Sequence, residues 1–135
     1  MRTVLAGVIL GCCAAIAVAG AAGSGSAQVS KAIGQTATLT WNAPTTYVGG
    51  ASIPSGTTIT YNVMSGAGTC TNATMSTTAA SNLTATSWVT PPYTATGATC
   101  YDVTATVNGE TSGPSNSVEV DVSAIPNAPG NLTAQ

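Results

Sequence analysis

Apolar and polar residues alternate with a period of two in four short segments of the chain, at residues 36–41, 58–63, 101–107 and 117–123. Successive side chains of a β-strand point to opposite faces, so each segment predicts a strand with one buried and one solvent-facing side. The residues predicted to face inward are Ala37, Leu39, Trp41, Ile59, Tyr61, Val63, Tyr101, Val103, Ala105, Val107, Val118, Val120 and Val122. Those predicted to face outward include Asp102, Thr104, Thr106, Glu119 and Asp121. The pattern is typical of antiparallel sheets packed face to face.

Turn-forming residues separate these segments. Residues 42–56 are rich in Pro and Gly, and Asn108-Gly109 is a strong hairpin signal between two alternating segments. The stretch 66–86 is the hardest to interpret, and we expect one or two weak edge strands there, followed by a strand near residues 86–90. The alternation does not decide whether Trp88 or Val89 faces inward. Beyond the N-terminal stretch the sequence shows no helical periodicity, so the predicted class is all-β.

The first 27 residues have the layout of a secretory signal peptide. Arg2 precedes an apolar stretch at residues 4–22, and small residues follow. Cleavage after Ala27 would leave Gln28 as the first residue, and residues 19–21 form a second candidate exit. The apolar stretch is nearly long enough to cross a bilayer, so an uncleaved anchor is the alternative. Its Gly and Ala content favours cleavage.

Cys12 offers a third fate for this segment. Residues 9–12 resemble a bacterial lipobox, in which the cysteine is lipidated and becomes the first residue. Leu10 is an uncommon occupant of that motif, and the residues after Cys12 remain apolar. The alternative is that Cys12 and Cys13 are small apolar residues of a signal helix. The sequence leaves cleavage, retention and lipidation open.

Cys70 and Cys100 are the cysteines that remain after the N-terminal segment. An exported domain with one cysteine pair favours a disulfide, because its compartment is oxidising. The alternative is two buried free thiols. The sequence contains no His and no C-x-x-C spacing that would favour a zinc site, so we expect no metal.

The charge of the chain narrows the classes of function. Charged residues make up 4% of the chain, with two cations, four anions and a net charge of −2. No basic stripe exists, so nucleic acid is not an expected partner. The combination of a nucleophile with a base, paired carboxylates or a metal set is also missing, so we expect no enzyme activity and no cofactor. Asp102, Glu119 and Asp121 form at most a small acidic patch, which we interpret as a solvated face.

The mature chain resembles a fibronectin type III domain, a seven-stranded immunoglobulin-like β-sandwich. Residues 39–44, "LTWNAP", resemble the family's second strand with its buried Trp, and residues 59–63, "ITYNV", resemble its third. Residues 101–122, "YDVTATVNGETSGPSNSVEVDV", resemble its last hairpin. The resemblance implies that strands three and six are antiparallel neighbours, which brings Cys70 at the end of one close to Cys100 at the start of the other.

The predicted organisation has three parts. Residues 1–27 are the signal segment, residues 28–124 the fibronectin type III-like domain, and residues 125–135 a tail that resembles the first strand of a further domain. The tail could be a frayed terminus, an edge cover on its own domain or a strand that pairs with another copy. We hypothesise the last of these, because the domain's own first strand, within residues 27–35, lacks the usual Pro and Leu.

The resemblance implies a non-catalytic module of a bacterial exported or phage structural protein. Such modules act as spacers, adhesion modules or carbohydrate contacts, so the expected partner is a protein or carbohydrate at a surface. Tyr47 is the candidate ligand contact, because an exposed Tyr offers contact area at low entropy cost; the alternative is that it covers the end of the core. The competing class is a self-associating surface component, either a lipoprotein or a strand-exchanging subunit. Both functions predict an extracellular, periplasmic or cell-surface location.

Overall fold

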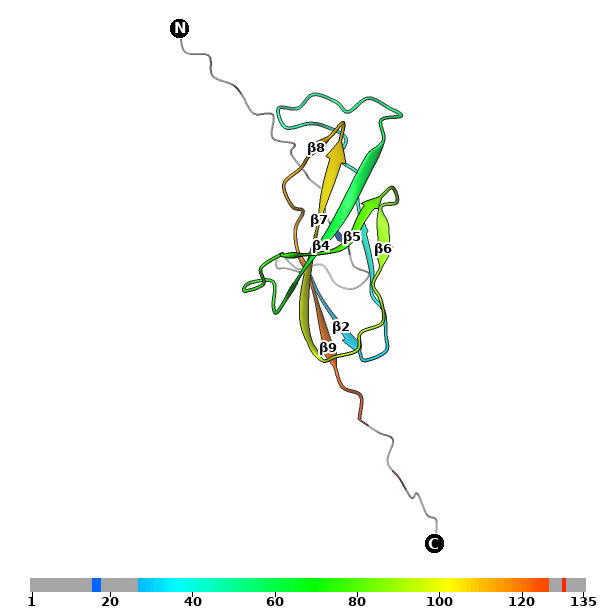
Figure 1. The fold of residues 1–135 in the computed structure, drawn as a ribbon, viewed down its shortest axis with the longest axis vertical. Coiled ribbons are helices and arrows are strands. Elements are labelled where there is room, and N and C mark those ends of the chain that lie inside the picture. Colours follow the sequence, from blue (N-terminus) through cyan, green and yellow to red (C-terminus); the bar gives the residue numbers. More distant parts are fainter. Residues whose placement is uncertain (1–15, 18–26, 127–129, 131–135) are drawn as a thin grey trace.

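The computed structural model of the 135-residue chain describes residues 16–17, 27–126 and 130 (Figure 1). The described residues form strands and no helix. The strands are β1 (Ile16–Ala17), β2 (Ala27–Ala32), β3 (Thr38–Trp41), β4 (Ile59–Ala67), β5 (Thr77–Leu83), β6 (Ser87–Val89), β7 (Gly97–Val107), β8 (Glu110–Thr111) and β9 (Val118–Ser123). Since β1 and β8 have two residues each, the other seven strands make up the body of the fold. In this part of the chain no helix is long and apolar enough to span a membrane.

The strands form two sheets. One sheet has the order β1-β3-β6, and the other has the order β2-β9-β7-β4-β5, with β8 paired to β7. All pairings are antiparallel except that of β2 with β9, which is parallel over six register pairs from Ala27↔Val118 to Ala32↔Ser123. The predicted immunoglobulin-like sandwich is confirmed, including the antiparallel pairing of β4 with β7 across nine register pairs.

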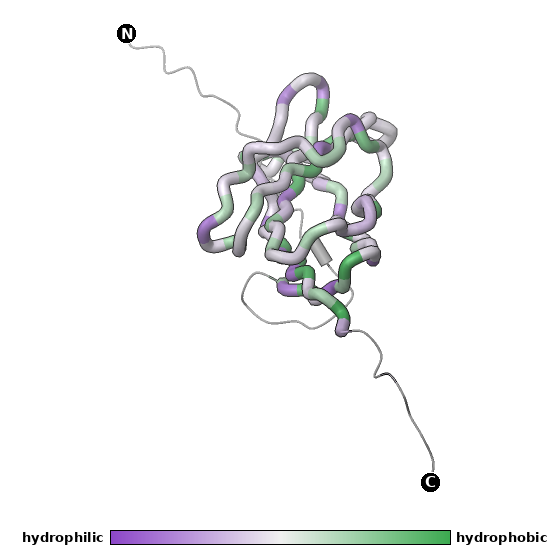
Figure 2. Tube along the Cα trace, turned by 60° about the horizontal axis from the view of Figure 1, so that its bottom comes forward, coloured by the Kyte–Doolittle hydropathy of each residue, from purple (hydrophilic) through white to green (hydrophobic). Residues whose placement is uncertain are grey.

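The core forms where the alternating segments place it. Leu39, Val63 and Val103 are completely buried, and the other inward residues of the four segments are buried as well except for Ile59, which is half-buried against the core. Trp41 and Tyr61 meet edge to face with their ring centroids 5.4 Å apart. Figure 2 shows hydrophobic and hydrophilic stretches interspersed along the whole trace, with no large block of either kind.

The stretch that was hardest to interpret forms one strand, β5, and then β6. In β6 Trp88 is half-buried and packs against the core, whereas Val89 is 53% exposed. The structure thereby settles the orientation that alternation alone left open. Asn108 and Gly109 both have positive φ, at 52° and 87°, and they join β7 to β8 with Val107 opposite Glu110. Those signs match the type I′ hairpin that the Asn-Gly pair predicts.

β2, the first of the seven strands that make up the body of the fold, has an unusual position. β2 lies beside β9 in the larger sheet and not beside β3 in the smaller one. The edge of β3 that faces away from β6 is paired with β1, through Ile16↔Trp41 and Ala17↔Thr40. Apart from residues 16, 17 and 27, the predicted signal segment lies outside the described residues, as do Cys12 and residues 127–129 and 131–135 of the predicted tail.

Candidate functional site

A disulfide joins Cys70 to Cys100 across a sequence separation of 30, with their Cα atoms 5.0 Å apart. Cys100 lies on β7, opposite Gly66 of β4, and Cys70 lies in the loop that follows β4. The bridge therefore ties the loop of residues 68–76 to the outer face of the larger sheet. This is the pairing predicted from the sequence, and such bridges are typical of oxidising compartments.

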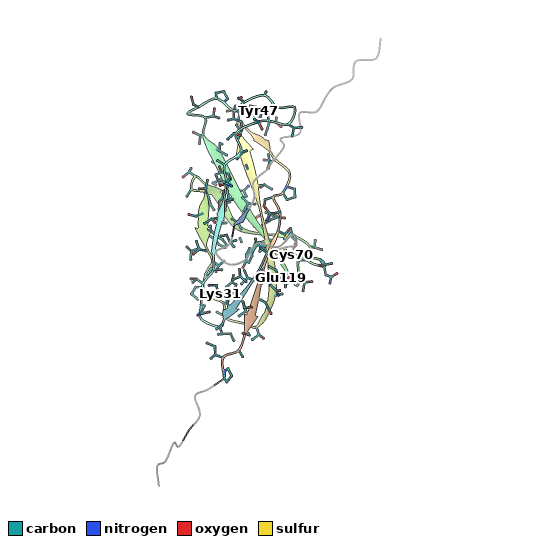
Figure 3. All side chains as sticks on the ribbon, turned by 180° about the vertical axis from the view of Figure 1, so that it is seen from behind. Lys31, Tyr47, Cys70 and Glu119 are labelled. Atoms are coloured by element: carbon teal, nitrogen blue, oxygen red, sulfur yellow. A yellow bond between two sulfur atoms is a disulfide. The ribbon has the colours of Figure 1, made fainter. Side chains whose placement is uncertain are left out.

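Glu119 is a second anchor for the same loop. Its Oε2 accepts a hydrogen bond from the backbone N–H of Cys70 at 3.0 Å, and its Oε1 accepts one from Nε2 of Gln28 at 3.0 Å. Figure 3 shows Cys70 and Glu119 close together, midway along the sandwich. The loop also packs onto the buried Gly66, where a Cβ atom would lie 2.4 Å from the backbone oxygen of Thr74. Glu119 thus holds β2, β9 and the disulfide loop together, which is a structural role.

Asp102 departs from the sequence prediction. Its position on β7 puts it on the outer face with Cys100, yet it is 6% exposed and not solvated. Its Oδ1 is buried and has no hydrogen-bond partner. Burial raises the pKa of the Asp102 carboxyl above its usual value. The alternation gave the correct face of the strand but could not show that other residues cover that face. Among the described residues, no three His, Cys, Asp or Glu side chains are grouped so that they could hold a metal ion.

We predict that Asp102→Asn raises the free energy of unfolding near pH 7 by about 1 kcal/mol, because a buried carboxylate without a partner is costly. Since the folded state holds its proton to higher pH than the unfolded state, the stability from this group is fully present below the ordinary pKa. This stability is lost as the pH rises through the raised pKa of the folded state. The stability gained by Asp102→Asn should therefore vanish near pH 3, where the wild-type carboxyl is protonated. Urea unfolding at both pH values measures it, with the half-buried Asp121→Asn as the control. An equal gain at both pH values would contradict the assigned cause.

Tyr47 lies at the tip of the loop between β3 and β4, at the end of the sandwich where β7 finishes (Figure 3). Its backbone forms a tight turn, with the N–H of Gly50 donating to the carbonyl of Tyr47 at 3.0 Å. The side chain is half-buried. Tyr47 is therefore neither a fully presented contact nor a fully buried cap.

A groove of about 390 Å³ opens at the other end of the sandwich, where β7 begins. Its floor comes from the inner face of the larger sheet, and residues 91–96, between β6 and β7, form the wall. The residues that line it are Ala67, Pro91, Pro92, Tyr93, Thr94, Ala95, Thr96, Gly97, Ala98, Thr99, Tyr101 and Val122. Its volume falls in the range of small-molecule sites, which is about 300–1,000 Å³.

The position of Tyr93 in this wall is fixed by its backbone. Its N–H donates to the carbonyl of Gln35 at 3.0 Å, and its carbonyl accepts from the N–H of Gly34 at 2.8 Å. Its hydroxyl donates to the hydroxyl of Tyr101, 3.5 Å away across the groove. Tyr101 itself lies 6.2 Å from Trp88, measured between ring centroids, in a tilted arrangement. The two phenols are therefore held by the sheet, by a turn and by an aromatic neighbour, which leaves little to reorganise on binding.

The groove is uncharged. None of its lining residues is Asp, Glu, Lys or Arg. Burial raises the pKa of the Tyr101 phenol above its usual value, and the hydrogen bond with Tyr93 adds to this effect. The Tyr101 phenol therefore stays neutral at physiological pH. Both tyrosines offer an aromatic face together with a hydroxyl that donates and accepts. Such a lining suits a neutral ligand with both apolar and hydroxyl surfaces, and it disfavours phosphates and other anions.

Tyr47, the candidate contact from the sequence, lies at one end of the sandwich, and the groove lies at the other. Tyr93 was not singled out because "TPPYTATG" contains turn residues only and has no periodicity. The available signal was the Tyr next to two prolines, since prolines stiffen a loop and a Tyr in a stiff loop is a favourable contact residue.

The sequence matches no protein-family model and no curated protein sequence. A solved structure described as that of an Fn3-like protein from Clostridium thermocellum is similar to this chain. The identity is 24%, the alignment covers 73% of this chain and 92% of that one, and the TM-score is 0.47. The assignment of an immunoglobulin-like sandwich therefore rests on the strand order and the core of the chain itself.

Proposed function

We propose that the chain is an exported, non-catalytic surface module that binds a neutral saccharide unit in the groove between its larger sheet and residues 91–96. The observation that carries this proposal is the pair of tyrosines, Tyr93 and Tyr101, held across an uncharged groove of about 390 Å³. A sugar ring presents apolar C–H faces and hydroxyl groups together, and it matches phenol rings with hydroxyl tips. A protein segment with an exposed neutral side chain is the alternative ligand.

The proposed location follows from two features. The disulfide favours an oxidising compartment, and residues 1–27 have the layout of a signal segment. A cleaved signal gives a free module, whereas retention of the segment or lipidation of Cys12 gives a membrane-attached one. The resemblance of residues 39–44, 59–63 and 101–122 to fibronectin type III strands supports the proposed setting in bacterial exported or phage proteins.

The proposal that the chain is not an enzyme rests on the structural roles of its carboxylates. Both oxygens of Glu119 accept structural hydrogen bonds, and Asp102 is buried under the outer face, away from the groove. The groove lining contains no side chain that would act as a general acid or base near neutral pH. Binding without chemistry is the activity that this lining supports.

Saturation-transfer NMR with a panel of neutral and acidic saccharides tests the proposal. We expect a neutral saccharide to bind and Tyr93→Ala to weaken its binding about tenfold or more, because the loss of an aromatic contact costs at least ~1.4 kcal/mol. Tyr47→Ala is the matched control, since Tyr47 is a half-buried loop Tyr at the other end of the sandwich. If Tyr47→Ala abolishes binding and Tyr93→Ala does not, the site is at the other end. If every saccharide fails to bind, the proposed ligand class is wrong.

A further inference from the structure

The smaller sheet has an edge that the sandwich does not cover with its own strands. β3 pairs with β6 on one side, through three register pairs. β2 does not cover the other side, because it pairs with β9 in the opposite sheet. The N–H of Trp41 donates to Thr86 at 3.0 Å, and the carbonyl of Ala37 accepts from Thr90 at 2.8 Å. Backbone groups alternate in direction along a strand, so those of Thr38 and Thr40 are directed at the other edge.

Within the described residues, that edge is covered by β1, which pairs with residues 40 and 41. β1 comes from the apolar stretch of the predicted signal segment. Removal of residues 1–27, which is the cleaved form of the proposed exported module, would remove this cover. The mature sandwich would then present β3 to solvent with its second edge open.

β3 has neither the charge nor the proline that commonly protects an edge strand from further pairing. Its sequence, "TLTW", contains no charge and no Pro, and its pairing with β6 is regular. The other edges are protected. β5 has register shifts against β4, β6 is three residues long and is followed by two prolines, and β2 carries Lys31. β3 is therefore the edge at which an added strand is favoured.

The C-terminal tail has the composition of such an added strand. Residues 124–135 contain no charge, and Asn131, Leu132, Thr133 and Ala134 alternate polar and apolar as β3 does. Ile125, just past the end of β9, is 66% exposed. Pro126 and Pro129 lie between β9 and residue 131, and proline-rich sequences in general favour extended conformations at ~3.1 Å per residue. Such a linker favours presentation of residues 131–134 to a second molecule over folding back.

We propose that the open edge of β3 accepts residues 131–134 from a second copy of this chain. The donated strand would run antiparallel to β3, as β1 does, and would place Leu132 and Ala134 on the core side beside Leu39 and Trp41. Since the donor and acceptor surfaces differ, the contact is head-to-tail and builds chains or rings. While Ile16 and Ala17 occupy the edge, it is closed, so assembly would follow the removal of the signal segment.

Sedimentation of the chain secreted by its producing cell tests this proposal over a range of concentrations. We expect the weight-average mass to rise with concentration to about twice that of one chain or more. Leu132→Asp should remain monomeric, because it would put a charge on the core side of the donated strand. Thr133→Asp is the matched control on the opposite face of the same strand and should assemble as the wild type does. Both positions come after β9, the last strand of the described sandwich, in the sequence, so the two substitutions change none of its strands.

On the acceptor side, Thr38→Pro removes one N–H from the open edge and leaves the bonds of Ala37 and Trp41 to the β6 side intact, so it should also lose assembly. A monomeric wild type at all concentrations overturns the proposal, and so does a Leu132→Asp variant that still assembles. Assembly that only Thr38→Pro abolishes would assign the edge to another segment and would also overturn it. The intact mass of the same sample reports removal of residues 1–27, and saccharide binding is measured separately, so failure of the proposed function is distinguishable.

Discussion

Replacement of both Cys70 and Cys100 by Ala is expected to lower the free energy of unfolding by about 3.5 kcal/mol or more. In the chain-entropy model, a crosslink that closes a loop of ~30 residues contributes roughly this amount. Cys100 is completely buried, so its truncation adds the cost of a small cavity. Small domains are stable by only ~5–15 kcal/mol, so the loss is a large fraction of the total. Urea unfolding of the variant and the wild type measures it.

The reduced wild type separates the two contributions. Reduction breaks the crosslink and leaves every side chain except the two thiols unchanged, so it should account for most of the loss, with the remainder due to the cavity. If the reduced and oxidised proteins unfold at the same denaturant concentration, the hydrogen bond from Cys70 to Glu119 and the packing of the loop on Gly66 hold the loop without the bridge. The entropic account of the bridge would then be wrong for this protein.

The sequence predicted the part of the fold that depends on local alternation. Leu39, Tyr61 and Val103 are buried because they occupy the apolar phase of strands whose opposite phase is Thr, Asn or Asp. The period of two identifies the face of a strand by itself. The Asn108-Gly109 hairpin was equally predictable, since its two positive φ values are a local property of those residues.

What the sequence could not supply depends on contacts between distant segments. Asp102 has the same alternation as Thr104, yet it is buried while Thr104 is half-buried. β2 could pair with the edge of either sheet, and it lies beside β9. The alternation of apolar and polar residues does not distinguish between these two edges. The groove needs residues 91–96 to stand over the inner face of the larger sheet, and no local pattern encodes that placement.

The comparison of the two tryptophans gives the second large effect. Trp41→Ala is expected to cost about 3–5 kcal/mol, the usual range for loss of a large core aromatic side chain. Trp41 is 4% exposed and packs edge to face on Tyr61 between the sheets. Trp88 is half-buried at the rim beside Tyr101, so Trp88→Ala should cost about half as much. Guanidinium unfolding, followed by the fluorescence of the remaining tryptophan in each variant, measures both.

Trp41→Phe distinguishes packing from polarity at this position. The indole Nε1 of Trp41 is buried and has no hydrogen-bond partner, which costs roughly 1–3 kcal/mol. Phe removes that donor and keeps one aromatic ring against Tyr61, so the gain offsets part of the lost volume. We therefore expect Trp41→Phe to lie within about 1.5 kcal/mol of the wild type, as volume-tolerant core exchanges do. If the Phe variant is as unstable as the Ala variant, one aromatic ring at this position does not stabilise the packing of the two sheets. The second ring of the indole would then be the part of Trp41 that is required.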